Sequence, residues 1–305
     1  MKAGRFSKIA ATLVAITAIV VMLGSQATAE TTGSAQLLVT VEPSKKATST
    51  ELKQGDVMIR QDHDRVPVTA LTPLRGQPLE LYIAIDQAVG PVFNTKIADL
   101  QKFINSLPAN VSVGIVNLQD GTVSIKQKPT TDHAAAARAI ALPLPGLGVS
   151  PFESIVDLLK QWPESNQRRE IVLLSPAIEP FGPQDQFQNP FVDQAIAAVQ
   201  RAGVPVFAIY TPAMGHWGHT FWRETWGESY LSQLADESGG DGYNMTAINP
   251  VSYSPYLSDI ATKLQNQYRV VFTPKPQNKA GFVQVRATTE VPNISLLASD
   301  RVWLQ

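Results

Sequence analysis

The chain has 305 residues, of which 44% are hydrophobic and 17% charged. This balance is typical of a globular protein with one large core, or one core and a smaller satellite. The formal net charge of −1 leaves no basic surplus to neutralise phosphates, so nothing in the composition favours nucleic-acid binding. The absence of cysteine excludes thiol catalysis, thiolate metal sites and a disulfide framework.

The amino terminus has the layout of a secretory signal peptide. Three basic residues precede the apolar run at residues 9–23: Lys2, Arg5 and Lys8. The small-residue pattern Ala27-Thr-Ala29 follows the run. The run is short for a transmembrane helix, which needs about 20 residues. We expect residues 1–29 to be cleaved, which leaves no membrane span and an exported protein, periplasmic or extracellular. The alternative is an uncleaved anchor.

Both ends of the remaining chain show the alternation of β-strands. Apolar and polar residues alternate between Gln36 and Leu74. The pattern returns after the 274–279 linker, in strands predicted at 282–288 and 294–303. Because isolated two-stranded units are only marginally stable, we expect residues 30–78 and 274–305 to pair with each other. Together they would form a small β-sandwich-like satellite domain.

Residues 79–273 alternate between strands and helices. The nearly continuous apolar run at 81–86 predicts a strand that is covered on both faces. Further strands are predicted at 111–117, 122–126, 171–175, 204–211 and 268–273. The first two of these flank Gln119-Asp-Gly121, which predicts a hairpin turn. Helices are predicted at 95–107, 132–142, 150–162, 190–203, 224–238 and 254–267. The alternation predicts an α/β fold, with a doubly wound, mostly parallel sheet flanked by helices.

Two of the predicted helices have clear starting signals. Ser150 stands before Pro151 and three residues ahead of Glu153, which is the spacing of a capping box with proline at the first helical position. Asn189 precedes Pro190 in the same way and is expected to cap the next helix.

Several short sequence motifs occur in the same order as in one known family. Asp86 ends the buried strand of LELYIAIDQAVGP, residues 79–91. The other motifs are the segment before the first core strand, at 51–74, the strand at 202–209, the helix end LADESGG at 234–240, and LQNQY with FTPK at 264–275. They resemble the von Willebrand factor A (VWA) domain, and most closely an exported bacterial subgroup, called VWFA-related and common in acidobacteria. The resemblance covers about residues 36–305 and implies a VWA/Rossmann-like fold.

In that family three loops hold a divalent ion through hard oxygen ligands. Asp86 matches the first aspartate of the family's Asp-x-Ser-x-Ser motif, but Ala88 and Gly90 replace its two serines. Ser150 falls where the second loop has threonine, and Pro176 where the third loop has aspartate. The resemblance therefore implies a degenerate metal-ion-dependent adhesion site. We expect no metal there, with Asp86 and Ser150 as weak candidate ligands. The simpler interpretation is that Ser150 caps its helix and Asp86 accepts backbone N–H bonds from its own loop.

The segment at 215–226 concentrates aromatic residues and contains two of the 4 histidines and three of the 5 tryptophans. Because it follows a predicted strand, we expect it at the carboxyl edge of the sheet, the usual ligand side. Six of its residues are candidates for binding a protein or a glycan: His216, Trp217, His219, Phe221, Trp222 and Trp226. The alternative is a loop that packs its own aromatics over the core. The two histidines also have a spacing that suits zinc, but no third ligand accompanies them.

Enzymatic signatures are absent from the sequence: it has no Gly-x-Ser-x-Gly elbow, no phosphate-binding glycine-rich loop and no His-Glu-x-x-His. We therefore predict no catalytic residue and no cofactor. The first hypothesis is an exported, non-catalytic interaction protein. It would bind a protein, or as a second choice a glycan, through loops 87–94, 146–150, 176–190 and 212–226. The alternatives are a magnesium-, manganese- or calcium-dependent adhesion module using Asp86 and Ser150, and an extracytoplasmic hydrolase using residues 216–226.

Overall fold

The computed structural model describes residues 33–46, 51–143, 150–164, 167–179, 189–212, 221–246 and 248–305, without the side chains of residues 221–224. All of these residues belong to one compact unit, Thr32–Gln305. The predicted signal peptide, residues 1–29, lies outside them. No helix in the described part of the chain combines the length and the apolar character that crossing a bilayer requires.

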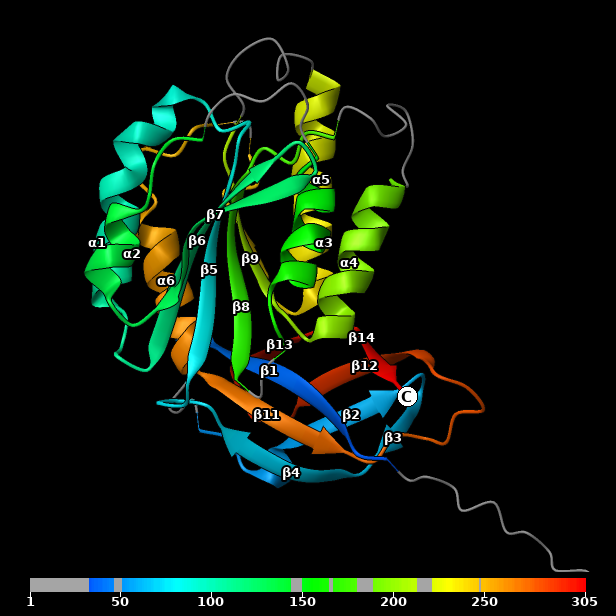
Figure 1. Cartoon of the computed structure of the whole chain (residues 1–305). Helices are drawn as coiled ribbons and strands as arrows, with labels where there is room; N and C mark the ends of the chain where they lie inside the picture. The colour runs from blue at the N-terminus through cyan, green and yellow to red at the C-terminus, as the bar shows by residue number, and fades with distance from the viewer. Residues whose placement is uncertain are drawn as a thin grey trace, which may run out of the picture. The chain divides into compact units, whose positions relative to one another are not determined.

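A six-stranded sheet forms the centre of the α/β region, with the strand order β10-β9-β8-β5-β6-β7 (Figure 1). Its strands are β5 (Leu79–Asp86), β6 (Val111–Gln119), β7 (Thr122–Thr130), β8 (Arg168–Ser175), β9 (Val206–Tyr210) and β10 (Asp241–Tyr243). All neighbours are parallel except β7, which pairs antiparallel with β6. The predicted hairpin turn between β6 and β7 is confirmed, because Asp120 and Gly121 both have positive φ, 49° and 75°.

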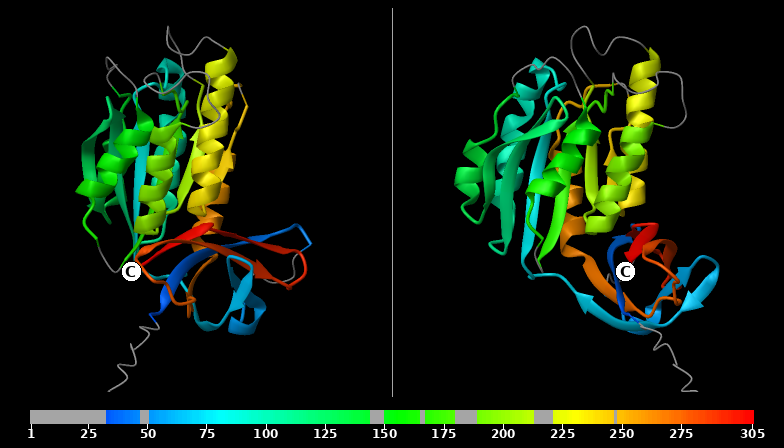
Figure 2. Two further views of the ribbon diagram at one scale, coloured as in Figure 1. Left: turned by 90° about the vertical axis from the view of Figure 1, so that its right-hand side faces the viewer. Right: turned by 45° about the vertical axis from the view of Figure 1, so that its right-hand side comes forward.

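Helices cover both faces of this sheet, as Figure 2 shows from two further directions. The helices on one face are α1 (Ile97–Ser106), α2 (His133–Arg138) and α6 (Ser254–Gln265), and those on the other are α3 (Pro151–Gln161), α4 (Pro190–Ala202) and α5 (Phe221–Ser238). Successive residues of β5 alternate between the two cores: Ile83 and Ile85 pack in the first, Tyr82 and Ala84 in the second. The prediction of a doubly wound, mostly parallel α/β fold is therefore confirmed.

The chain ends build two four-stranded antiparallel sheets with the orders β13-β1-β11-β4 and β14-β12-β2-β3. Their strands are β1 (Ala35–Pro43), β2 (Val57–Gln61), β3 (Asp64–Val66), β4 (Val68–Pro73), β11 (Gln267–Phe272), β12 (Gly281–Thr289), β13 (Ile294–Ala298) and β14 (Arg301–Leu304). β1 pairs with β13, and β2 pairs with β12. The expected pairing between the amino-terminal and carboxyl-terminal strands is present, around a core of its own.

The strand predicted at 268–273 is real, but its placement after the other parallel strands is wrong. β11 pairs antiparallel with β1 and β4 and belongs to the satellite. Only Asn266 separates the end of α6 from the start of β11. A single residue is too short for the chain to reverse its direction and enter the parallel sheet. Alternate residues of β11, Val270 and Phe272 among them, are buried in the satellite core instead.

A buried polar network joins the amino end of β8 to the satellite. Arg168 donates to the Leu264 carbonyl at 3.0 Å and to Gln267 Oε1 at 2.5 Å. The Gln267 amide donates in turn to Glu170 Oε2 and to Thr40 Oγ1, both at 3.1 Å. The satellite is thereby held at the amino ends of the parallel strands, which leaves the loops at their carboxyl ends on the opposite edge of the sheet.

Candidate binding site at the carboxyl edge of the parallel sheet

The strand order reverses between β5 and β8. From β5 the chain continues to β6 and β7 on one side, and from β8 to β9 and β10 on the other. In open α/β sheets, ligands bind at such a point because the loops that follow the two central strands turn away from each other. Asp86 and Ser175 are the last residues of these two strands. They form the floor of the candidate site.

Asp86 is 1% exposed, and both of its carboxylate oxygens accept hydrogen bonds. The Ser175 hydroxyl donates to Oδ2 at 2.5 Å, and the Ala88 N–H donates to Oδ1 at 2.9 Å. The expectation that Asp86 accepts a backbone bond from its own loop is confirmed. Burial raises the pKa of Asp86 to about 6, although the hydrogen bonds from Ala88 and Ser175 act in the opposite direction. No neighbouring cation is among the causes of this shift.

The loop that follows β8 has a strained backbone. Ala177 has a φ of 51°, in the left-handed region that residues with a Cβ rarely adopt. The Ser175 hydroxyl accepts the Ala177 N–H at 2.7 Å while it donates to Asp86. Gly227 of α5 packs against the same loop so closely that an added Cβ would lie 2.3 Å from the Pro176 carbonyl oxygen. These contacts hold the loop in one conformation above the ends of the strands.

Ser150 begins α3 at the same edge, but its hydroxyl does not cap the helix as expected. It donates instead to Glu179 Oε2 at 2.7 Å, and no side-chain cap bond is present. The prediction of a side-chain cap is therefore wrong: the Ser150 hydroxyl is oriented by its charge-assisted bond to Glu179 and accepts no helix N–H. The backbone carbonyl of Ser150 still accepts the first helical bond, from Ser154. By contrast, the predicted cap by Asn189 is confirmed, since its side chain accepts the Phe191 N–H.

Glu179 lies in the predicted binding loop 176–190, but sequence reasoning does not single it out. It follows β8 in a loop, where no motif or spacing distinguishes it from the other polar residues. Its contact with Ser150 depends on how two loops that are distant in the sequence approach each other. Only the fold reveals this contact.

The described residues at this edge do not fit a divalent cation. Ala88, Gly90 and Pro176 contribute no side-chain oxygen. Both oxygens of Asp86 already accept protein hydrogen bonds, and the Ser150 hydroxyl is directed to Glu179. Within the described ranges, no group of three or more histidine, aspartate or glutamate side chains is placed to hold a metal ion. Magnesium and calcium require six or more oxygen ligands, so a large part of their shell would have to be water.

Of the six aromatic and histidine candidates, only Trp226 has a described side chain. His216, Trp217 and His219 lie outside the described residues, and so do the side chains of Phe221 and Trp222. Trp226 is half-buried and packs against the core between the sheet and α3–α5. Its ring stacks on Tyr230 with centroids 6.0 Å apart and an interplanar angle of 22°. For Trp226 the structure supports the alternative interpretation, an aromatic packed over the core.

The loop after β10 brings two further residues to the same edge. Ile248 is 72% exposed and Val251 is 93% exposed, and they are the exposed large hydrophobic side chains of the described residues. Asn244 fixes the loop by donating to the carbonyls of Tyr210 and Ile248, both at 3.0 Å. Lys96 donates to the Val251 carbonyl at 2.5 Å. No sequence pattern predicts β10, so none assigns this loop to the edge.

No protein-family model matches the chain, and no curated protein matches it. Solved structures do match. VWA2, the ArnB paralog from Sulfolobus acidocaldarius, is 13% identical, with 88% of this chain and 75% of that chain covered and a TM-score of 0.37. The vWF domain of the type V pili tip protein Mfa5 from Porphyromonas gingivalis is 13% identical, with 63% and 95% covered and a TM-score of 0.44.

A third match is the manganese-loaded TRAP protein from Plasmodium vivax, which is 11% identical, with 76% of this chain and 96% of that chain covered and a TM-score of 0.37. The VWFA-related subgroup and the degenerate metal site stay predictions. Von Willebrand factor A domains are among the solved structures to which this chain is similar.

Proposed function

We propose that this protein is an exported, non-catalytic interaction protein that binds a protein partner through its carboxyl-edge loops without a bridging metal ion. The observation that carries the proposal is the state of Asp86. Its two oxygens are occupied by Ser175 and Ala88, and burial favours its neutral form. A carboxylate that is held in this way stabilises the loops of the site, and a cation would have to compete with both of these hydrogen bonds.

The two exposed residues after β10 support a protein as the partner. Ile248 and Val251 present apolar side chains to solvent from a loop that hydrogen bonds hold in place. Buried apolar anchors within a polar surround supply most of the binding energy at protein interfaces, and exposed apolar groups on a rigid loop suit that role. A glycan is the second choice. Export rests on the signal peptide predicted at residues 1–29.

Capture from the native envelope fraction tests this proposal. The intact protein is compared with a variant carrying Ile248→Ser and Val251→Ser, and with a variant carrying alanine in place of Trp217, Trp222 and Trp226. The first variant is expected to retain the melting temperature, because both side chains are exposed, and to capture the same partner at least about tenfold less. Capture that is equal in all three proteins would contradict binding at this edge. EDTA is expected to leave capture unchanged, and loss of the partner in EDTA would contradict metal-free binding.

A further inference from the structure

The outer face of the β3-β2-β12 sheet carries a row of three arginines. Arg60 of β2 lies directly opposite Arg286 of β12 on one side and Arg65 of β3 on the other. Residues opposite each other in antiparallel strands project from the same face, and neighbouring strands lie about 4.8 Å apart. The backbone positions that carry the three arginine side chains therefore lie within about 10 Å of one another. All three side chains are exposed.

This row has no structural role that accounts for it. Like charges directly opposite each other destabilise a sheet. In the part of the chain that the structure describes, none of the three arginines has an ion pair or a side-chain hydrogen bond, whereas nearby Lys275 and Arg301 are paired with Asp64 and Glu237. The core of the satellite is filled from the inner face of the same strands. The row is therefore a concentration of positive charge that is available to bind an anionic group.

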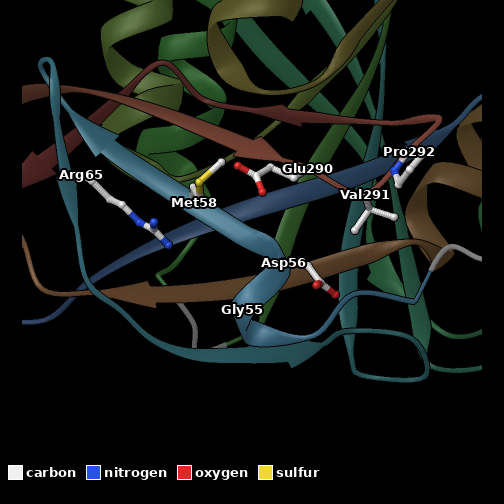
Figure 3. A pocket seen from close by; sticks show the side chains of 7 residues that line it. All are labelled: Gly55, Asp56, Met58, Arg65, Glu290, Val291 and Pro292. Carbon is white, nitrogen blue, oxygen red and sulfur yellow. The ribbon is translucent and has the colours of Figure 1, made fainter.

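A cavity of about 360 Å³ opens at one end of the row (Figure 3). The residues that line it come from the segment before β2, from β2 and β3, and from the turn after β12: Gly55, Asp56, Met58, Arg65, Glu290, Val291 and Pro292. Met58 lies on the same face of β2 as Arg60, two residues away, and Arg65 belongs both to the row and to the cavity. The row and the cavity therefore form one continuous surface.

We propose that this surface docks an extended acidic segment of a protein partner, with its carboxylates on the arginine row and an apolar side chain in the cavity. The planar guanidinium fork of arginine matches a carboxylate in two parallel hydrogen bonds. Met58, Val291 and Pro292 give the cavity an apolar part that an aliphatic side chain fills. The surface belongs to the satellite, so the proposal is independent of the function proposed for the carboxyl edge.

The charges of the cavity argue for a peptide over a continuous polyanion. Asp56 and Glu290 place two carboxylates beside the cavity, and these repel a chain of phosphates or sulfates that runs on from the arginines. A peptide alternates its side chains and can place an apolar one there. The net charge of the whole chain, −1, likewise provides none of the general attraction on which polyanion binding depends.

Fluorescence anisotropy with the full chain tests the proposal. The probe is a fluorescein-labelled synthetic peptide with three glutamates at alternate positions followed by leucine. The double variant Arg60→Gln, Arg286→Gln is expected to bind it at least about tenfold more weakly. The matched control is Lys126→Gln, Lys128→Gln, which removes the same charge from exposed strand residues of β7 and is expected to bind within about twofold of the unchanged protein. A probe with serine in place of leucine is expected to bind more weakly to every protein.

The arginine variant is expected to keep or raise the melting temperature, because the substitutions remove repulsion between neighbouring strands. Weaker binding at an unchanged melting temperature therefore supports the proposal. Equal loss of binding in both double variants would show a non-specific effect of charge and would overturn it. Tighter binding of polyphosphate or dextran sulfate at the same arginines, with no measurable binding of the peptide, would assign the surface to a polyanion and would also overturn it.

Discussion

The Ser175 hydroxyl donates a hydrogen bond of 2.5 Å to the buried carboxylate of Asp86, and this bond joins the ends of β5 and β8 at the point where the strand order reverses. The same hydroxyl accepts the N–H of Ala177, whose backbone is left-handed. One serine therefore connects the central aspartate to the loop that follows β8. The buried carboxylate therefore helps to fix the conformation of the loops that follow β5 and β8.

The stability of the protein is expected to depend on pH through Asp86. Its folded-state pKa of about 6 lies above its ordinary value of 3.8, so between about pH 4 and pH 6 the folded protein binds more protons than the unfolded chain does. The free energy of unfolding therefore falls as the pH rises through this window, by up to about 3 kcal/mol for this group, and the contribution of Asp86 is constant above it. Burial raises the pKa of Glu170 as well, which acts in the same direction.

Asp86→Asn is expected to remove this part of the pH dependence, because an amide does not titrate. Urea unfolding of both proteins between about pH 4 and pH 7 measures the difference. The variant should lose less stability than the unchanged protein as the pH rises. Identical slopes in the two proteins would show that Asp86 is ionised in the fold throughout this range.

Gly227→Ala is expected to destabilise the protein although alanine is the better helix former. In an exposed helix this substitution stabilises by about 1 kcal/mol, but here the new Cβ would meet the Pro176 carbonyl oxygen at 2.3 Å. The backbone of the loop that follows β8 or of α5 must then move, and we expect a net loss of about 1–3 kcal/mol in the free energy of unfolding. Gly281→Ala is the control, since its Cβ would meet nothing within 4 Å. A stabilised Gly227→Ala protein would contradict the close packing.

The buried pair Arg168 and Glu170 is expected to behave as a unit. The two charges lie 3.2 Å apart, with side chains 4% and 0% exposed. Arg168→Met alone leaves a carboxylate without its cation and should lower the free energy of unfolding by about 3–5 kcal/mol. The double variant with Glu170→Leu should be more stable than the single one, because it removes the uncompensated charge. A double-mutant cycle measures the coupling, and additive losses would show that the two residues act independently.

Much of the fold follows from local patterns in the sequence. The apolar run that ends at Asp86 identifies the central strand, and positive φ at Asp120 and Gly121 is what their residue types favour. β10, at Asp241–Tyr243, is not predicted, because a strand of three residues that includes a glycine is too short to show the alternation of a β-strand. The pattern of β11 predicts a strand but does not identify its neighbours, and the structure pairs it with β1 and β4 in the satellite.

The candidate site was less predictable than the fold. Asp86 is predicted because it ends a buried strand and matches the first aspartate of the family motif that the chain resembles. Its bond with Ser175, the contact of Ser150 with Glu179, and the exposure of Ile248 and Val251 all depend on the packing of loops that are distant in the sequence. No local pattern contains that information.

Calorimetric titration with manganese at about pH 7 tests the central claim most directly, because a metal-dependent site would release or absorb heat on saturation. The protein is predicted to give no saturable signal, whereas a variant with Ala88→Ser, Gly90→Ser and Pro176→Asp, which places three side-chain oxygen donors near Asp86, is predicted to gain one. Gly90 has a φ of −77°, which serine adopts without backbone strain. A saturable signal of about millimolar affinity or tighter in the unchanged protein, abolished by Asp86→Ala, would contradict metal-free binding.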